Sequence, residues 1–384
     1  MAERPLDGVV VVDMGQVLAT PFATYLLHLL GAEVVKIEPP AGEWMRGGNP
    51  RGFATQNAGK QSVTVDLRSP GGSEVVRRLI EAADVFVEGF APGTAESMGL
   101  GWDDARKRNP TIVYGSLSAF GSSGPYAGRP GFDHVVQAVS GTMMSSGFPG
   151  GPPIKVGAPY LDYGGGLLLA FGLLAGILER RRTGRAVRVD ATMLDAGLLM
   201  NAAALVNTQA TGVDPPRTGN NAFSGAVASG AFETSDGWLM LAANKASHLT
   251  KLEALLGVDP LPTDDVDRAR AVLGGIFATD TATRWETRLN AAGVPAARVR
   301  SLSEVTGEGY PIERGLLSPV DVPGADEPLY LPGAGIRLDG TMPAPTAPPP
   351  AVGQHTGTVL ARFGFSDEEI GRLAADGAIT LPER

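Results

Sequence analysis

The first third of the chain alternates short apolar runs with segments of helical periodicity, and this alternation restricts the fold more than any other feature. The run GVVVVDMG (8–15) is typical of a strand buried on both faces, and residues 20–31 follow with helical spacing and end at a glycine. Further strands are predicted at 32–40, 61–69, 84–90 and 111–121. Strands and helices that alternate in this way predict a parallel, doubly wound α/β sheet with right-handed crossovers.

The rest of the chain is more varied. Residues 125–159 are rich in Gly, Ser, Pro and Met and are expected to form loops around one short helix. Further elements are predicted as follows: a long helix after Asp162, a strand and helix at 184–206, a hairpin at 230–244 and helices at 247–257, 268–279 and 281–293. Near the C-terminus, Ser366 and Glu369 suit a capping box.

The composition limits the classes of partner and of chemistry. With 32 Lys and Arg against 41 Asp and Glu, the net charge is −9, which argues against a nucleic-acid-binding protein. The chain has no Cys, so disulfides, zinc–thiolate sites and a cysteine nucleophile are excluded. The longest uncharged apolar stretch (164–178) is shorter than the roughly 20 residues that span a membrane, and we expect a buried helix there. No signal peptide is visible, and a cytoplasmic location is expected.

The common motifs for cofactors and catalysis are missing. No GxGxxG follows the first strand, so no nucleotide redox cofactor is expected, and NAGKQS (57–62) has the wrong spacing for a phosphate-binding P-loop. No serine has glycines two positions to either side, as the nucleophile of α/β-hydrolases requires. The four His are not spaced as metal ligands, and no metal is expected. Carboxylates remain as candidate nucleophiles.

Asp162 is the only charged residue in GAPYLDYGGGLLLAFGLLAGIL (157–178). An unpaired carboxylate in an apolar setting is costly, so such a residue is usually paired or functional. A lone Asp at a helix start is also a common N-cap, and this alternative stays open on the residues alone.

Six segments in order resemble the class III CoA-transferase family (CaiB/BaiF-like), which includes formyl-CoA transferase, carnitine CoA-transferase and α-methylacyl-CoA racemase. They are GVVVVDMGQVLATPFATYLLHLLGAEVVKIEPPAGEWMR, NAGKQSVTVDLRSPGG, ADVFVEGFAPGTAESMGLGW, NPTIVYGSLSAFGSSGPYAGRPGFDHVVQAVSG, GAPYLDYGGG and VGQHTGTVLARFGFSDEEIGRL. The resemblance therefore covers nearly the whole chain.

The resemblance implies that Asp162 is the catalytic carboxylate. In transferases of the family it attacks an acyl-CoA thioester, forms a mixed anhydride and then an enzyme–CoA thioester, and a carboxylic acid acceptor completes the exchange. Gly164 and Gly165 are expected at the substrate, where they would let backbone and thioester approach Asp162. Backbone N–H groups at this helix start could also bind an oxyanion.

The resemblance also suggests how coenzyme A is held. Lys60 and Arg46 are candidates for its phosphates, against the alternative of solvated surface charges, and Val17, Ala19, Gly89 and Phe90 are further candidate contacts. Two positions where the family commonly has Arg are occupied by Ala91 and Ser97, which puts part of the phosphate site in doubt.

The stretch RPGFDHVV (129–136) separates transferase from racemase. The racemase carries His directly before the Asp, where this chain has Phe132, and proton transfer at one carbon needs two titratable groups. Asp133 could assist CoA exchange or be a loop hydrogen-bonder, Gln137 could contact the acyl group, and His134 is expected to be partly buried. His355 is expected in a C-terminal packing loop rather than at the site.

The expected architecture is a large Rossmann-like α/β domain built from both chain ends, with a smaller α+β domain, in an interlocked homodimer. The expected regions are 1–200 (large domain), 201–225 (linker), 226–320 (small domain), 321–333 (linker) and 334–384 (large domain). The predicted function is acyl-CoA:carboxylate CoA-transfer. The alternatives are a 2-methylacyl-CoA racemase or epimerase and a non-catalytic CoA-ester binding protein, and the sequence identifies neither the donor nor the acceptor acid.

Overall fold

The computed structural model describes residues 4–69, 71–222 and 225–382 and divides the chain into two compact units. The first unit comprises residues 1–142, 155–211 and 311–384, and the second comprises 143–154 and 212–310. These boundaries differ from those expected above. Residues 143–154 belong to the second unit and 311–333 to the first, and the expected linker 201–225 is divided between the first unit (201–211) and the second (212–225). Composition does not reveal contacts between segments that are distant in sequence.

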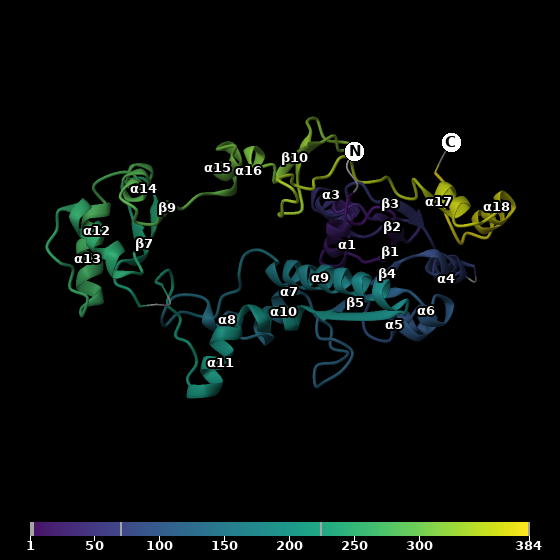
Figure 1. Cartoon of the computed structure of the whole chain (residues 1–384), viewed down its shortest axis with the longest axis horizontal. Coiled ribbons are helices and arrows are strands. Elements are labelled where there is room, and N and C mark those ends of the chain that lie inside the picture. Colours follow the sequence, from purple (N-terminus) through teal and green to yellow (C-terminus); the bar gives the residue numbers. More distant parts are fainter. Residues whose placement is uncertain (1–3, 70, 223–224, 383–384) are drawn as a thin grey trace. The chain divides into compact units, whose positions relative to one another are not determined.

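A parallel six-stranded sheet forms the centre of the first unit, with the strand order β3-β2-β1-β4-β5-β6 (Figure 1). Its strands are β1 (Val10–Met14), β2 (Glu33–Glu38), β3 (Gln61–Thr64), β4 (Val85–Glu88), β5 (Val113–Ser118) and β6 (Val187–Thr192). Residues one apart on a strand face opposite sides, so Val11 and Val12 belong to different cores. The predicted doubly wound sheet is confirmed.

Helices cover both faces of this sheet. The helices of the first unit are α1 (Ala19–Leu29), α2 (Met45–Gly48), α3 (Pro50–Asn57), α4 (Gly72–Ala82), α5 (Thr94–Ser97), α6 (Trp102–Arg108), α7 (Asp133–Val139), α9 (Tyr160–Thr183), α10 (Met193–Met200), α11 (Ala202–Thr211), α17 (Thr356–Arg362) and α18 (Asp367–Ala375). One core joins β1 to α1 and α9, and the other joins it to α4, α17 and α18. The C-terminal helices therefore complete a domain that begins at the N-terminus.

Several details of the sequence analysis are confirmed. Ser366 and Glu369 form the expected capping box at the start of α18. His355 lies in a packing loop, where its Nδ1 accepts the Ser62 N–H at 3.2 Å. The sequence patterns did not indicate α2, α3 or an antiparallel pair, β10 (Leu317–Val320) and β11 (Leu329–Pro332). This pair is held to α1 by a 2.6 Å hydrogen bond from the Tyr25 hydroxyl to the Pro332 carbonyl.

The second unit is an α+β fold around an antiparallel sheet, β7-β8-β9. Its elements are β7 (Ser229–Glu233), β8 (Trp238–Ala242), α12 (Ala246–Leu256), α13 (Val266–Phe277), α14 (Ala282–Ala291), β9 (Ala296–Arg298) and α15 (Leu302–Gly307), while the short helices α8 (Thr142–Ser145) and α16 (Tyr310–Glu313) lie where the chain passes between units. The predicted hairpin corresponds to β7 and β8. The three predicted helices correspond to α12, α13 and α14.

Helix α9 is the one described helix that is long and apolar enough to cross a membrane by length and composition. Half of its most apolar window is buried inside the protein. Leu169 and Leu173 pack into the core shared with β1 and α1. In this structure α9 is the central helix of a folded domain.

Candidate active site

A cavity of about 300 Å³ opens where the strand order reverses, between β1 and β4. Ligands of open α/β sheets bind at such switch points, beyond the carboxyl ends of the strands. The lining comes from the loops that follow β1, β4 and β5, from the segment that leads into α7, and from α9 and α10. It consists of residues 16–20, 89–92, 117–121 and 129–132 together with Asp162 and Met193.

Asp162 is the one carboxylate among the described residues that line this cavity. It lies in the first turn of α9, and its carboxylate oxygens form no hydrogen bond within the described part of the chain. Burial, and then the nearby charge of Asp133, raise the pKa of Asp162 to about 6. The group is therefore mostly ionised at neutral pH and is free to react with a molecule in the cavity.

Asp133 caps the helix that carries Asp162. Its Oδ2 accepts the Leu161 N–H at 2.7 Å and the Asp162 N–H at 3.3 Å, and its side chain is buried. The N-cap alternative considered for Asp162 is therefore wrong, because Asp133 supplies the capping carboxylate from α7. Asp133 does not line the cavity and acts on the site through Asp162.

The start of α9 has no free donor for an oxyanion. The N–H groups of Leu161 and Asp162 are bound by Asp133, the Tyr160 N–H bonds to the Ala158 carbonyl, and the Tyr163 N–H bonds to the Pro159 carbonyl. The expectation that these N–H groups bind an oxyanion is therefore wrong.

Gln137 is fully buried and is not part of the cavity lining. Its Nε2 donates to Asp133 at 2.5 Å, and its Oε1 accepts the Val156 N–H at 2.9 Å. The expected contact with the acyl group is replaced by a structural role, in which Gln137 orients the capping carboxylate.

The three glycines after Asp162 serve helix packing rather than substrate access. A Cβ on Gly164 would lie 2.5 Å from Cε of Met200, and one on Gly166 would lie 2.6 Å from the Ala19 carbonyl oxygen. A Cβ on Gly165 would meet Leu117 and Met193 at 3.3 and 3.4 Å. None of the three lines the cavity, so the expected substrate contacts of Gly164 and Gly165 are not present.

Four of the expected CoA contacts do line the cavity: Val17, Ala19, Gly89 and Phe90. Thr20 lies between the two loops that carry them, because a Cβ on Gly15 would lie 2.6 Å from Thr20 Cγ2 and one on Gly89 would lie 2.6 Å from Thr20 Oγ1. At the carboxyl end of each flanking strand a buried acid accepts the N–H two residues on: Asp13, the penultimate residue of β1, from Gly15, and Glu88, the last residue of β4, from Phe90. Both loops are thus closely held.

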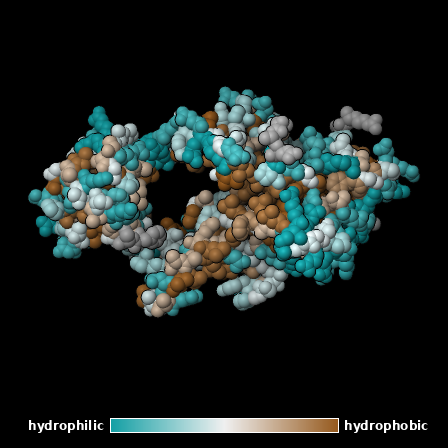
Figure 2. Space-filling model, viewed as in Figure 1, coloured by the Kyte–Doolittle hydropathy of each residue, from teal (hydrophilic) through white to brown (hydrophobic). Residues whose placement is uncertain are grey.

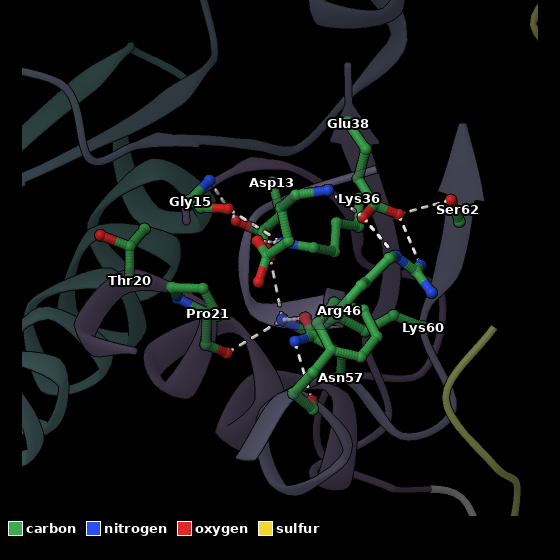
Figure 3. Close-up of polar contacts among 12 residues, drawn as sticks. Asp13, Gly15, Thr20, Pro21, Lys36, Glu38, Arg46, Asn57, Lys60 and Ser62 are labelled. Carbon is green, nitrogen blue, oxygen red and sulfur yellow. Dashed lines mark hydrogen bonds and ion pairs between the residues drawn. The ribbon is translucent and has the colours of Figure 1, made fainter. Parts of the chain in front are cut away.

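Lys60 does not face the cavity. Its side chain is completely buried, and its Nζ lies 2.9–3.0 Å from oxygens of Asp13, Pro21, Thr24 and Asn57 (Figure 3). Burial lowers the pKa of Lys60 to about 8, although Asp13 opposes this shift. The arrangement corrects the expectation that Lys60 binds a CoA phosphate, since all of its donors are used inside the protein.

Arg46 is also engaged within the protein. Its guanidinium makes two 2.7 Å bonds to the Glu38 carboxylate, donates to the Pro350 carbonyl and lies over the Phe53 ring. Figure 3 shows this pair beside the Lys60 cluster. Arg46 lines neither the active-site cavity nor the cavity beyond the carboxyl ends of β1, β2 and β3, so its expected phosphate role is not supported.

A second cavity of about 310 Å³ lies beyond the carboxyl ends of β1, β2 and β3. It shares Gln16 and Phe90 with the first cavity and includes Arg68, whose side chain is 90% exposed. Arg68 pairs with Asp66, whose carboxylate also lines this cavity, at 3.1 Å. Arg68 was not among the candidate residues, although it lies near the end of the strand predicted at 61–69.

Phe132 and His134 are the two residues on which the comparison with the racemase motif depends. Phe132 lines the cavity and is 67% exposed, and its ring stacks on His134 at 6.4 Å. His134 is exposed rather than partly buried as expected, and it is not among the residues that line the cavity. The position at which the racemase needs a proton carrier is held by a phenyl ring.

Comparison with known proteins identifies the family. A model described as CoA-transferase family III matches residues 6–356. The chain belongs to this family. A succinyl-CoA:glutarate CoA-transferase from Mus musculus is 31% identical over 99% of this chain and 91% of its own length. The probable fatty acyl-CoA transferase Rv3272 from Mycobacterium tuberculosis is 34% identical over 94% of this chain and 98% of its own.

Solved structures of family III proteins have the same fold. A crystal structure of Rv3272 matches with a TM-score of 0.82 and 34% identity over 92% of this chain and 99% of that one. A CAIB/BAIF family protein from Brucella suis matches with a TM-score of 0.83 and 28% identity over 94% of this chain and all of that one. The predicted family, the mixed α/β fold and the enzyme class, a CoA-transferase, are confirmed.

The family implies CoA thioesters as substrates. Among the described residues no group of three or more His, Asp or Glu is placed to hold a metal ion. The expected absence of a metal and of a redox cofactor stays a prediction, as do the cytoplasmic location and the absence of nucleic-acid and membrane partners.

Proposed function

We propose that the protein exchanges CoA between an acyl-CoA donor and a carboxylic acid acceptor, with Asp162 as the covalent nucleophile. The observation that carries the proposal is the state of the Asp162 carboxylate. It is partly buried, forms no hydrogen bond within the described chain and faces a cavity at the switch point of the sheet. A raised pKa makes a carboxylate a better nucleophile while it stays ionised at neutral pH.

The reaction consists of two reversible halves. A carboxylate oxygen of Asp162 attacks the thioester carbonyl carbon and the C–S bond breaks. CoA thiolate is released, and a mixed anhydride between Asp162 and the acyl group is formed. The thiolate then attacks the Asp162 carbonyl carbon and expels the donor acid, which forms an aspartyl-CoA thioester. The acceptor carboxylate reverses these steps, since it displaces the thiolate to form a new anhydride. The thiolate then attacks the acceptor's carbonyl, and the Asp162 carboxylate is regenerated.

The apolar lining suits these intermediates. Leu18, Phe120, Phe132 and Met193 surround the cavity that Asp162 faces. Anhydrides and thioesters hydrolyse when water reaches them, so an apolar lining favours transfer to an acid over transfer to water.

The replacement Asp162→Asn tests the nucleophile directly. The exchange rate is expected to fall by several orders of magnitude, because the amide cannot form the anhydride. Wild-type protein incubated with an acyl-CoA and hydroxylamine should carry a hydroxamate at Asp162, which peptide mass spectrometry detects. The matched control is Asp367→Asn, which changes an exposed acid in the first turn of α18. Near-wild-type exchange by Asp162→Asn would show that another group is the nucleophile.

Arg129 is proposed to bind the carboxylate of the acceptor. It is the one cationic side chain among the described residues that line the active-site cavity, and it lies 4.4 Å above the Tyr126 ring. Tyr126 in turn packs on Phe120, whose ring is 5.7 Å away. An acid that enters a cavity already holding the Asp162 charge needs a compensating cation, and a guanidinium is suited to carboxylates.

Replacement of Arg129 by Gln should raise the KM for the acceptor about tenfold or more, because it removes a charged hydrogen bond, and leave the KM for the donor within about twofold. The two constants can be separated by varying donor and acceptor independently. Arg106→Gln is the control, since Arg106 is exposed on α6 and pairs with Asp103. A change in the donor KM alone would instead place Arg129 at the CoA moiety.

We also propose that two copies of the chain associate through α9, α10 and α11. Leu167, Phe171 and Leu178 form an exposed stripe on α9, and α11 has no buried residue. Figure 2 shows hydrophobic residues gathered over these helices. An apolar surface of this kind is typical of a protein interface, and a second copy of the chain fits the interlocked homodimer that the family resemblance implies.

A further inference from the structure

Two ion pairs lie completely buried beneath the loop between β1 and α1. Lys60 Nζ is 2.9 Å from Asp13 Oδ2, and Lys36 Nζ is 2.7 Å from Glu43 Oε2 (Figure 3 labels three of these residues). All four side chains are at most 1% exposed. None of them lines the active-site cavity or its neighbour, so the proposed chemistry leaves them without a role.

This buried cluster, Asp13, Lys36, Glu43 and Lys60, holds both polar groups of Gly15. Asp13 Oδ1 accepts the Gly15 N–H at 2.7 Å, and Lys36 Nζ donates to the Gly15 carbonyl at 2.9 Å. Lys60 also donates to the Pro21 carbonyl and the Thr24 hydroxyl, both at 2.9 Å, and so ties the start of α1 to the same cluster.

The residues directly after Gly15 are strained and lie at the ligand site. Val17 has φ +66°, a left-handed conformation that a β-branched residue adopts only when its surroundings hold it there. Gln16, Val17 and Leu18 all line the active-site cavity. Gly15 itself has no room for a side chain between Thr20 and Asp13.

We propose that the buried cluster positions the loop 15–18 for the CoA thioester, with Asp13 and Lys36 as the residues that hold Gly15. Buried ion pairs contribute little net stability, because the loss of hydration offsets their attraction. The cluster instead fixes the orientation of Gly15, because Asp13 accepts its N–H and Lys36 donates to its carbonyl. The inference rests on the proposed function, because it takes the CoA thioester to be the ligand of this cavity.

The double variant Lys36→Met/Glu43→Gln removes one ion pair and the bond to the Gly15 carbonyl without leaving a buried charge unpaired. The KM for the acyl-CoA donor is expected to rise about tenfold or more, since the ligand must now order the loop, whereas the KM for the acceptor stays within about twofold. Hydrogen exchange at the amides of 15–18 should become faster.

The matched control is Asp84→Asn/Arg180→Gln. It removes a partly buried ion pair of the same unit in which Asp84 also accepts the Val10 N–H, at the amino end of β1. This variant should be destabilised to a similar degree in thermal unfolding and keep the wild-type KM values. Equal rises in donor KM for both variants would show that only general stability matters, and the inference would be wrong.

A measurement on the wild type keeps the test decisive if the double variant does not fold. The Gly15 amide should exchange as slowly as those of β1. Exchange as fast as that of the exposed loop residues 122–124 would overturn the inference. The proposed function fails separately, when wild-type protein shows no exchange with any donor and acceptor. Wild-type exchange together with an unchanged donor KM in the double variant contradicts the positioning role alone.

Discussion

Two carboxylates, Asp162 and Asp133, set the chemistry of the site at the scale of single residues. Oδ2 of Asp133 accepts two backbone N–H groups of α9, and its Oδ1 accepts the Gln137 amide. These bonds hold the charge of Asp133 close to Asp162. Asp162 keeps both of its oxygens free within the described chain. The burial of Asp162 and the charge of Asp133 both disfavour its ionised form, and its pKa is raised to about 6.

This raised pKa predicts how the rate depends on pH. Since the nucleophile must be ionised, kcat/KM for the acyl-CoA donor should fall as the pH drops through about 6. Asp133→Asn keeps a capping oxygen and removes the neighbouring charge, so the pKa of Asp162 falls and activity extends to lower pH. The pH profiles of both proteins, with Asp367→Asn as the control, measure the shift. An unchanged profile in Asp133→Asn would mean that Asp133 does not set the pKa of the nucleophile.

At the scale of elements, α9 is positioned by how closely its glycines let it approach its neighbours. Gly166 meets the backbone of α1, and Gly164 meets Met200 of α10. The capping bonds from α7 then fix the first turn of α9, which carries Asp162 at the edge of the cavity.

The replacement Gly166→Ala should destabilise the fold by about 1–3 kcal/mol, because the new Cβ would lie 2.6 Å from a backbone oxygen and one helix must move. The control Gly371→Ala, in α18, has open space around its Cβ and should stabilise the protein by about 0.5–1 kcal/mol. Denaturant unfolding of both variants measures the difference. Equal effects would show that close packing of α9 on α1 is unimportant for stability.

At the scale of the whole molecule, the chain closes its first unit with both of its ends. Thr64 on β3 donates to the Thr380 carbonyl at 2.8 Å, and its N–H bonds to the Thr356 hydroxyl at 3.2 Å. The C-terminal segment thereby covers the edge strand of the sheet, which removes an exposed edge. The apolar face of α9, α10 and α11 remains exposed in a single copy of the chain.

The proposed homodimer predicts the molar mass in solution. Wild-type protein should be a dimer at micromolar concentration, and the double variant Phe171→Glu/Leu178→Glu should be monomeric, because it places charges on side chains that are 73% and 66% exposed in one copy. Light scattering coupled to size-exclusion chromatography measures both. Leu302→Glu, on α15, changes another exposed leucine and should remain dimeric. A monomeric wild type would refute the dimer.

The order of the elements follows from the sequence, because it depends on local patterns. Continuous apolar runs predicted the buried strands. Ser366 and Glu369, which are three positions apart, predicted the capping box of α18. Asp162 stood out as a single charge in an apolar segment, and the resemblance of six segments assigned it a role.

The partners of the polar side chains were decided by the tertiary structure. Lys60 and Asp13 are 47 residues apart, and Asp133 and Leu161 are 28 apart, so no local pattern shows that these groups meet. A lysine in a loop next to a glycine reads as a surface cation, and only the folded sheet places it under α1 with every donor used. The glycines after Asp162 are a similar case. A glycine can leave open space for a substrate or let two helices pack closely, and the sequence looks the same for both. The element that packs against each glycine decides between these two roles. Here that element is α1 or α10, which are distant from Asp162 in the sequence.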